Sequence, residues 1–293
     1  MNQFHPEVSQ RLKKGDKIGI VCCSNGLEPE KKQQVEELLI TLPELGLTPV
    51  LSPYLYARGD DVRSASAKER AEVLMGFYRD KEVKAVFDIS GGDVAVEILP
   101  YLDFDVIADS AITFWGYSDL TTIINAIYAK TGKVSCLYQL RNLVRSRGAE
   151  QKERFLDYLQ GGNNLCTFSY EYLQGEGMQG TLVGGNARCL LKLAGSDFFP
   201  DMTGKILFLE GLSGGVGPLV SFFSQLRIQG VFEQVGGILL GTFTEMEKKK
   251  LLPSAFEILK EMIPDPLPVA VTKEIGHGAG SRCLILGSDV HLA

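Results

Sequence analysis

Histidine is scarce in this sequence: only three occur among 293 residues, and none stands near another histidine or a pair of cysteines. Because zinc sites need clustered ligands, the sequence predicts neither a metal nor another cofactor. The six cysteines are scattered and include no Cys-x-x-Cys pair. Most of them stand in apolar surroundings, so we expect reduced, buried thiols of the kind found in cytoplasmic proteins.

Long apolar runs are also absent, and none approaches the roughly 20 residues that a membrane helix needs. The first twenty residues lack the apolar stretch of a secretory signal. A formal net charge of −6, without long runs of one sign, argues against a nucleic-acid partner. These absences predict a cytoplasmic globular protein with no membrane or nucleic-acid partner.

Short β-rich runs alternate with helical apolar patterns through the first half of the chain. The runs at 17–23, 49–52, 85–89 and 111–117 are interleaved with helical patterns, of which 28–45 and 66–79 are examples. Such alternation predicts an α/β fold in which helices cover a parallel sheet. Five glycines between 160 and 180 mark a boundary. We therefore predict an amino-terminal domain over 1–159, a crossing linker over 160–179 and a carboxyl-terminal domain over 180–293.

The run at 111–117 stops at Ser118 and Asp119, and a helical pattern follows from Leu120. A serine at a strand–turn–helix junction presents its hydroxyl where backbone N–H groups can hold an anion, so Ser118 is a candidate nucleophile. Ser or Asp before a helix is also a common helix cap, and this alternative stays open. Leu120 stands where the ordinary α/β-hydrolase turn has its second glycine.

Two further polar residues stand at a predicted strand end or in a glycine-rich loop, where function often collects. Glu210 ends an apolar strand, and His277 is flanked by glycines. Serine becomes a good nucleophile when a histidine takes its proton and a carboxylate orients that histidine. Each residue also has a plainer explanation, as a solvated glutamate or an ordinary loop histidine. His5 and His291 stand close to the chain ends and are poor candidates.

The segment Ser90-Gly91-Gly92-Asp93 follows a predicted strand but lacks the Gly-x-Gly-x-x-Gly and Gly-Lys-Ser/Thr patterns of nucleotide loops. Glycines at such a turn let backbone N–H groups approach a substrate oxygen closely. We therefore predict an oxyanion hole formed by the backbone amides of Gly92 and Asp119.

Four motifs occur in order between about Lys17 and Leu286. They are Gly116-Tyr117-Ser118-Asp119-Leu120-Thr121, Gly184-Gly185-Asn186, Gly204-Lys205-Ile206-Leu207-Phe208-Leu209-Glu210 and Gly276-His277-Gly278. Together they resemble the LD-carboxypeptidase family of serine peptidases, which also includes microcin C immunity proteins. The resemblance implies a flavodoxin-like amino-terminal parallel-sheet domain and a smaller carboxyl-terminal α/β domain, with the active site at their interface.

The resemblance also implies an activity and a role for each candidate residue. By position, Ser118 corresponds to the nucleophile, Glu210 to the orienting carboxylate and His277 to the general base. The implied enzyme is a cytoplasmic, metal-free serine carboxypeptidase, commonly a homodimer. It would release terminal D-alanine from murein tetrapeptides during peptidoglycan recycling.

This chain departs from the family pattern at two places. The family usually has Arg-Gly-Gly-Tyr-Gly where this chain has Ser90-Gly91-Gly92-Asp93-Val94, so the arginine and the tyrosine are missing. We expect Gly91 and Asp93 to face the substrate, and Asp93 would disfavour an anionic group unless it is paired or turned away. The family's Glu-Asp is Glu210-Gly211 here.

Two alternative functions remain open. An immunity-type hydrolase would cleave the amide of a peptidyl or aminoacyl nucleotide. Such relatives tend to place an aromatic residue in a loop over the base, and the stretch 211–217 contains no tryptophan. A non-catalytic protein would close two lobes on a small ligand and use Ser118 as a helix cap.

Overall fold

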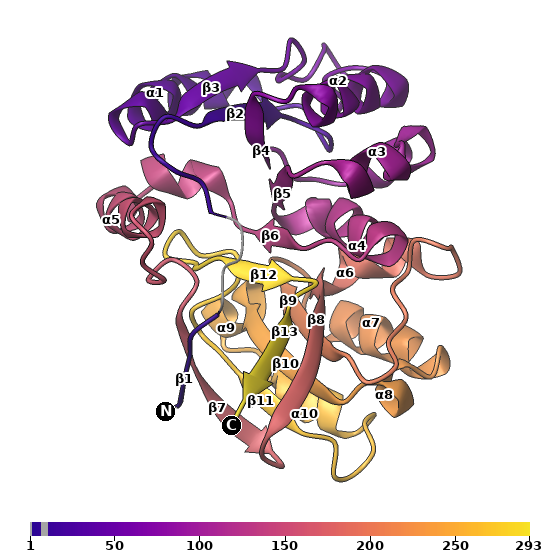
Figure 1. Cartoon of the computed structure of the whole chain (residues 1–293). Coiled ribbons are helices and arrows are strands. Elements are labelled where there is room, and N and C mark those ends of the chain that lie inside the picture. Colours follow the sequence, from indigo (N-terminus) through magenta and orange to yellow (C-terminus); the bar gives the residue numbers. More distant parts are fainter. Residues whose placement is uncertain (1, 7–10) are drawn as a thin grey trace.

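The computed structural model describes residues 2–6 and 11–293, and its two sheets lie one above the other, each with helices on its faces (Figure 1). The strands of the first sheet follow the order β12 (Leu284–Leu286), β6 (Ser135–Leu137), β5 (Thr113–Gly116), β4 (Val83–Asp88), β2 (Lys17–Val21) and β3 (Thr48–Leu51). From β6 to β3 the neighbouring strands are parallel. This order and direction are those of flavodoxin-like sheets, which confirms the predicted fold class.

Helices cover both faces of the first sheet, because its parallel strands are apolar on both sides. One face carries α1 (Lys32–Glu44) and α5 (Gly148–Leu159), and the other carries α2 (Ala67–Arg79), α3 (Phe104–Asp109) and α4 (Thr121–Thr131) (Figure 1). Short 3₁₀ segments complete this half: η1 (Pro29–Lys31), η2 (Ala95–Tyr101), η3 (Ser118–Leu120) and η4 (Leu140–Val144). Local sequence explains where α2 begins, since Ser66 and Glu69 form a reciprocal capping box.

The second sheet is mixed, with the order β1 (Asn2–Phe4), β7 (Phe168–Gln174), β11 (Val269–Val271), β10 (Gly237–Phe243), β9 (Ile206–Gly211), β8 (Met178–Asn186) and β13 (Asp289–Leu292). Its central strands β11, β10, β9 and β8 are parallel. Helical segments follow these strands: α6 (Ala187–Leu190), η5 (Leu191–Leu193), α7 (Val216–Ile228), α8 (Val231–Gln234), α9 (Thr244–Lys249) and α10 (Ala255–Lys260).

The helix α4 joins the two halves, because it is buried on the face of the first sheet that meets the second. Ile123 and Ile127 of α4 belong to the same apolar cluster as Leu182 of β8 and Phe208 of β9. The residues that follow Ser118 in the chain therefore lie against the strands that lead to Asn186 and Glu210.

Two short strands cross the boundaries expected from the sequence. The strand β12 comes from the predicted carboxyl-terminal domain but pairs antiparallel with β6 in the first sheet. Conversely, β1 lies near the start of the chain and pairs with β7 in the second sheet. The predicted linker over 160–179 contains β7 and the beginning of β8. The division into 1–159, 160–179 and 180–293 stays a prediction.

None of the helices in the described part of the chain combines the length and apolar character needed to cross a membrane. Each of the six cysteines is a free thiol, and all of them are buried, as predicted.

Candidate active site

Ser118 lies at the end of β5 in a strained backbone conformation. Its φ is +57°, a region that side-chain-bearing residues rarely adopt, whereas the preceding Tyr117 is extended. No side-chain hydrogen bond caps η3 or α4. The helix-cap alternative for Ser118 is therefore wrong, and the hydroxyl is directed elsewhere. Strain of this kind persists when the surrounding structure enforces it, as at a nucleophile turn.

The buried side chain of the next residue, Asp119, holds this turn in place. Its side chain is fully buried, and its Oδ2 accepts hydrogen bonds from Ser24 Oγ at 2.6 Å and from the Ala95 amide at 2.8 Å. Its other oxygen pairs with the ammonium of Lys192, which belongs to η5 in the second half. Residues from three segments thus hold the turn that carries Ser118.

Polar contacts fix α4 onto the Gly184-Gly185-Asn186 motif. Asn125 of α4 donates to the carbonyl of Gly184 at 2.8 Å and accepts from its amide at 2.9 Å. The amide of Asn186 donates to Thr121 Oγ1 at 3.0 Å. A Cβ on Gly185, whose φ is +135°, would lie 2.5 Å from that Thr121 oxygen. Glycine at position 185 is therefore what allows the two halves to approach this closely.

The three candidate residues form one hydrogen-bonded chain. His277 Nδ1 lies 2.6 Å from Glu210 Oε2, and His277 Nε2 lies 3.0 Å from Ser118 Oγ. The Glu210 side chain is fully buried, and that of His277 is 7% exposed. An ionised carboxylate can only accept a hydrogen bond, which places the imidazole hydrogen on Nδ1 and leaves Nε2 to accept from the serine hydroxyl.

Two residues beside the hydrogen-bonded Ser118, His277 and Glu210 were not assigned a role from the sequence. Asn186 Nδ2 donates to Glu210 Oε1 at 3.0 Å, so both carboxylate oxygens of Glu210 are engaged. The ring of Tyr117 lies 4.6 Å from the imidazole of His277, centroid to centroid. Burial, reinforced by the charge of Glu210, raises the pKa of the Tyr117 hydroxyl well above its usual value. Tyr117 therefore stays neutral and shields the imidazole from water.

The glycine loop predicted to form an oxyanion hole lies beside Ser118. A Cβ on Gly91 would be 3.9 Å from Ser118 Cβ, and Gly92 lines the same pocket as Ser118. Within the described residues, the backbone amides of Gly92 and Asp119 donate to no protein acceptor. Position 90, where the family pattern has an arginine, holds a buried serine whose amide donates to Asp88 at 2.8 Å.

Asp93 does not line the pocket, which differs from the expectation that it faces the substrate. Its carboxylate pairs instead with the guanidinium of Arg188 at 2.5 Å, and Lys192 lies 3.9 Å away. The repulsion expected between Asp93 and an anionic substrate is thus balanced by two cations. The sequence contained no local signal for this pairing, because it joins residues 95 positions apart.

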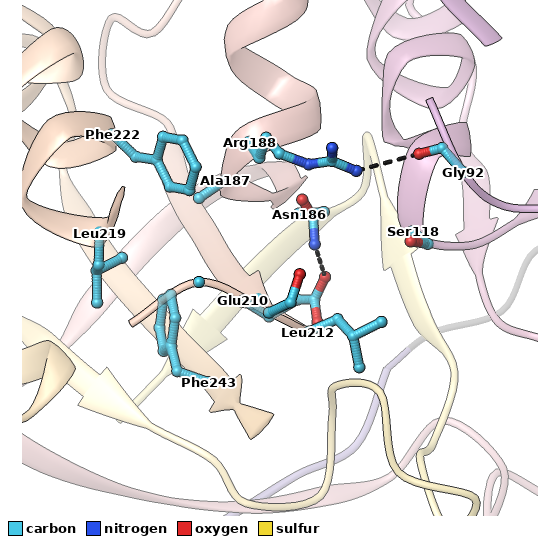
Figure 2. Close-up of a pocket in the computed structure, with 13 residues that line it drawn as sticks. Gly92, Ser118, Asn186, Ala187, Arg188, Glu210, Leu212, Leu219, Phe222 and Phe243 are labelled. Carbon is cyan, nitrogen blue, oxygen red and sulfur yellow. Dashed lines mark hydrogen bonds between the residues drawn. The ribbon is translucent and has the colours of Figure 1, made fainter. Parts of the chain in front are cut away.

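A pocket of about 110 Å³ opens between the two halves beside Ser118 (Figure 2). Its polar end lies near Ser118, Asn186 and Arg188, and apolar side chains form the opposite wall. The lining residues are Gly92, Ser118, Asn186, Ala187, Arg188, Glu210, Gly211, Leu212, Ser213, Gly214, Leu219, Phe222 and Phe243.

Neither of the remaining histidines takes part in this site. His5 contacts Thr167 at 3.2 Å, and His291 lies in β13 at the edge of the second sheet. Among residues 2–6 and 11–293, no three histidine, cysteine, aspartate or glutamate side chains are grouped so as to hold a metal ion.

Comparison with known proteins identifies the family. Residues 18–138 match the LD-carboxypeptidase N-terminal domain, and residues 179–292 match the LD-carboxypeptidase C-terminal domain. The chain belongs to the LD-carboxypeptidase family. Membership supports serine carboxypeptidase activity, and it confirms the resemblance read from the four sequence motifs.

Individual relatives carry two kinds of name. The chain is 29% identical to a probable murein peptide carboxypeptidase of Bacillus subtilis, over 94% of this chain and 88% of that protein. It is 26% identical to the microcin C7 self-immunity protein MccF of Escherichia coli, over 90% of this chain and 86% of that protein. A solved structure of MccF has the same fold, with a TM-score of 0.83, 23% identity and 98% of both chains covered.

Proposed function

We propose that this protein is an LD-carboxypeptidase that releases terminal D-alanine from murein tetrapeptides. The observation that carries the proposal is the hydrogen-bonded chain from Ser118 through His277 to Glu210 at the edge of a pocket. A hydroxyl, an imidazole and a carboxylate in this order can transfer one proton and form an acyl-enzyme without a metal. Names of relatives such as the murein peptide carboxypeptidase of Bacillus subtilis support the substrate class.

In the proposed mechanism, His277 Nε2 takes the proton of the Ser118 hydroxyl. The Ser118 oxygen attacks the carbonyl carbon of the peptide bond to the terminal D-alanine. Glu210 stabilises the imidazolium that forms, and Asn186 holds Glu210 in place. The backbone amides of Gly92 and Asp119 donate to the oxyanion of the tetrahedral intermediate. His277 then gives the proton to the leaving amine of D-alanine.

The acyl-enzyme is released by water in a second step of the same kind. His277 removes a proton from the water molecule, whose oxygen attacks the ester carbon, and returns that proton to the oxygen of Ser118. This restores the hydroxyl and frees the shortened peptide. Tyr117 and the buried Glu210 restrict the imidazole to the position that serves both steps.

The test is release of D-alanine from a purified murein tetrapeptide, followed by chromatography of the shortened peptide and by enzymatic assay of D-alanine. We expect the native protein to release one D-alanine per tetrapeptide and the Ser118→Ala variant to lose at least about 10⁴-fold in kcat. Full activity in the Ser118→Ala variant would show that Ser118 is not the nucleophile. A native protein that releases no D-alanine would contradict the proposed substrate.

The second candidate function is hydrolysis of a peptidyl or aminoacyl nucleotide amide. It is favoured by the 26% identity to the MccF immunity protein and by the rings of Phe222 and Phe243 on the pocket wall. The loop at 211–217 contributes no tryptophan to the site, and the one tryptophan of the chain, Trp115, is buried in the first sheet. Turnover of a muropeptide against an aminoacyl-sulfamoyl adenosine separates the two candidates.

A non-catalytic binding protein is the third possibility, and it is disfavoured because Ser118 makes a hydrogen bond to His277 rather than capping a helix. Labelling of Ser118 by a fluorophosphonate would contradict it directly.

We further propose a cytoplasmic location and a homodimer, on the basis of the family. Fractionation of cells and light scattering of the purified protein test these two points. A periplasmic protein or a monomer at micromolar concentration would contradict them.

A further inference from the structure

The pocket beside Ser118 has an uneven distribution of charge. Among the described residues that line it, Glu210 is the acidic side chain and Arg188 the basic one. Glu210 already binds His277 and Asn186 through its two oxygens. Arg188 is therefore the cation that an anionic group entering the pocket would meet.

Arg188 reaches the site from the second half of the protein. It belongs to the short helix α6, directly after Asn186, and its guanidinium extends toward the glycine loop of the first half (Figure 2). One terminal nitrogen donates to Asp93 Oδ1 at 2.5 Å, and the other donates to the carbonyl of Gly92 at 3.1 Å. These two contacts hold the guanidinium at the loop beside Ser118.

The guanidinium retains donors for a ligand. Arginine has five N–H hydrogens in a planar fork, and the contacts to Asp93 and Gly92 use two of them. The Arg188 side chain is 48% exposed, and that of its partner Asp93 is 57% exposed. A ligand can therefore reach the guanidinium, and Asp93 can turn toward water when a second carboxylate arrives.

An enzyme that removes one terminal residue has to recognise a free carboxylate close to the bond it cleaves. Arginine binds carboxylates through two parallel hydrogen bonds, which fixes orientation as well as charge. We propose that Arg188 determines specificity by binding the terminal carboxylate of the substrate, and that Asp93 holds the guanidinium in position while the site is empty. This inference rests on the proposed function.

The proposal predicts opposite effects at the two partners. Removing the charge at Arg188 takes away the carboxylate site, so the affinity for a peptide with a free terminal carboxylate falls. Removing the charge at Asp93 takes away a competing anion, so that affinity rises. A merely structural role for the Arg188–Asp93 ion pair would make both substitutions harmful in the same direction.

The test measures binding without turnover, using Ser118→Ala as the background. The probes are acetyl-L-lysyl-D-alanine with a free carboxylate and the same dipeptide as its terminal amide, titrated by calorimetry. Adding Arg188→Gln is expected to weaken binding of the free acid at least about 10-fold and to change the binding of the amide by less than about 2-fold. Arg188→Lys should recover part of the loss, and Asp93→Asn should tighten binding of the acid.

The matched control is Arg227→Gln, which removes the same charge from an exposed position on α7 away from the pocket. It should bind both probes as the background protein does. Equal losses for acid and amide in Arg188→Gln, or no loss, or no binding of the free acid at millimolar concentration would overturn the inference. A preference for the acid that depends on Arg188 would stand even if the native protein released no D-alanine, and that result would contradict the proposed function alone.

Discussion

The two sides of the candidate site are built differently, and each is supported by the other half of the protein. The Ser118 turn ends a strand of the first sheet, is strained, and is anchored by Asp119 to Lys192 of the second half. His277 stands in an irregular loop that runs from β11 of the second sheet to β12 of the first. The carbonyls of that loop accept hydrogen bonds from Gln151 and Arg154 of α5 in the first half.

This reciprocal support indicates that neither half can hold its part of the site alone. The nucleophile turn needs a cation from the second half, because the hydrogen bonds from Ser24 and Ala95 leave the charge of a fully buried carboxylate unpaired, which is costly. The histidine loop needs a donor from the first half at the carbonyl of Ser281, because that contact is buried and Gln151 supplies its hydrogen bond. Each substitution below tests one side of this comparison, in order of decreasing expected effect.

Glu210→Gln is expected to have the largest effect, a fall of about 10³–10⁴-fold in kcat with the fold retained. The amide can no longer stabilise a charged imidazolium, and it can favour the wrong tautomer of His277. Steady-state kinetics on a murein tetrapeptide measures the effect, and circular dichroism checks the fold. A change of less than about 10-fold would show that the carboxylate does not serve His277 in the reaction.

Gly185→Ala is expected to destabilise the protein by about 3 kcal/mol, because the new Cβ would lie 2.5 Å from Thr121 Oγ1 at a φ of +135°. The interface between α4 and β8 would have to separate. Chemical denaturation measures the change in free energy of unfolding. The control is Gly217→Ala, since a Cβ there meets nothing within 4 Å. Equal stability of the two variants would contradict close packing at position 185.

Asp119→Asn removes a support of the Ser118 turn, and Gln151→Leu removes a support of the His277 loop. We expect each to cost about 2 kcal/mol of stability, since each leaves buried polar groups without partners. We also expect both to lower kcat, Asp119→Asn by displacing Ser118 and Gln151→Leu by loosening the loop of His277. Denaturation and kinetics on the same preparations measure both quantities. Loss of stability with unchanged kcat would show that the supports do not position the site.

Ser118→Gly has the smallest expected effect on the free energy of unfolding, and this effect is stabilising rather than destabilising. Glycine adopts a φ of +57° without the penalty that other residues meet there, so the variant should be more stable than Ser118→Ala by about 1 kcal/mol. Both variants remove the hydroxyl and should be equally inactive. Thermal and chemical unfolding of the two proteins gives the comparison, and equal stability would mean that the turn relaxes when the serine is lost.

Much of the fold was readable from local patterns. The helical pattern over 66–79 predicted α2, and the alternation of strand and helix predicted a parallel sheet covered by helices. The strand, turn and helix around Ser118 were also predicted, because apolar periodicity and turn residues act within a few positions of the chain. The exchange of β1 and β12 between the sheets was not predicted, since very short edge strands carry little periodic signal.

By itself the sequence determined the fold class and the strand, turn and helix around Ser118, because these depend on backbone preferences and on the burial of apolar faces. Only the tertiary structure decided that Ser118 meets His277 across 159 positions and that Arg188 pairs with Asp93 across 95. Side-chain contacts at such separations depend on how the two sheets pack through α4. No periodicity or local preference along the chain encodes that packing directly.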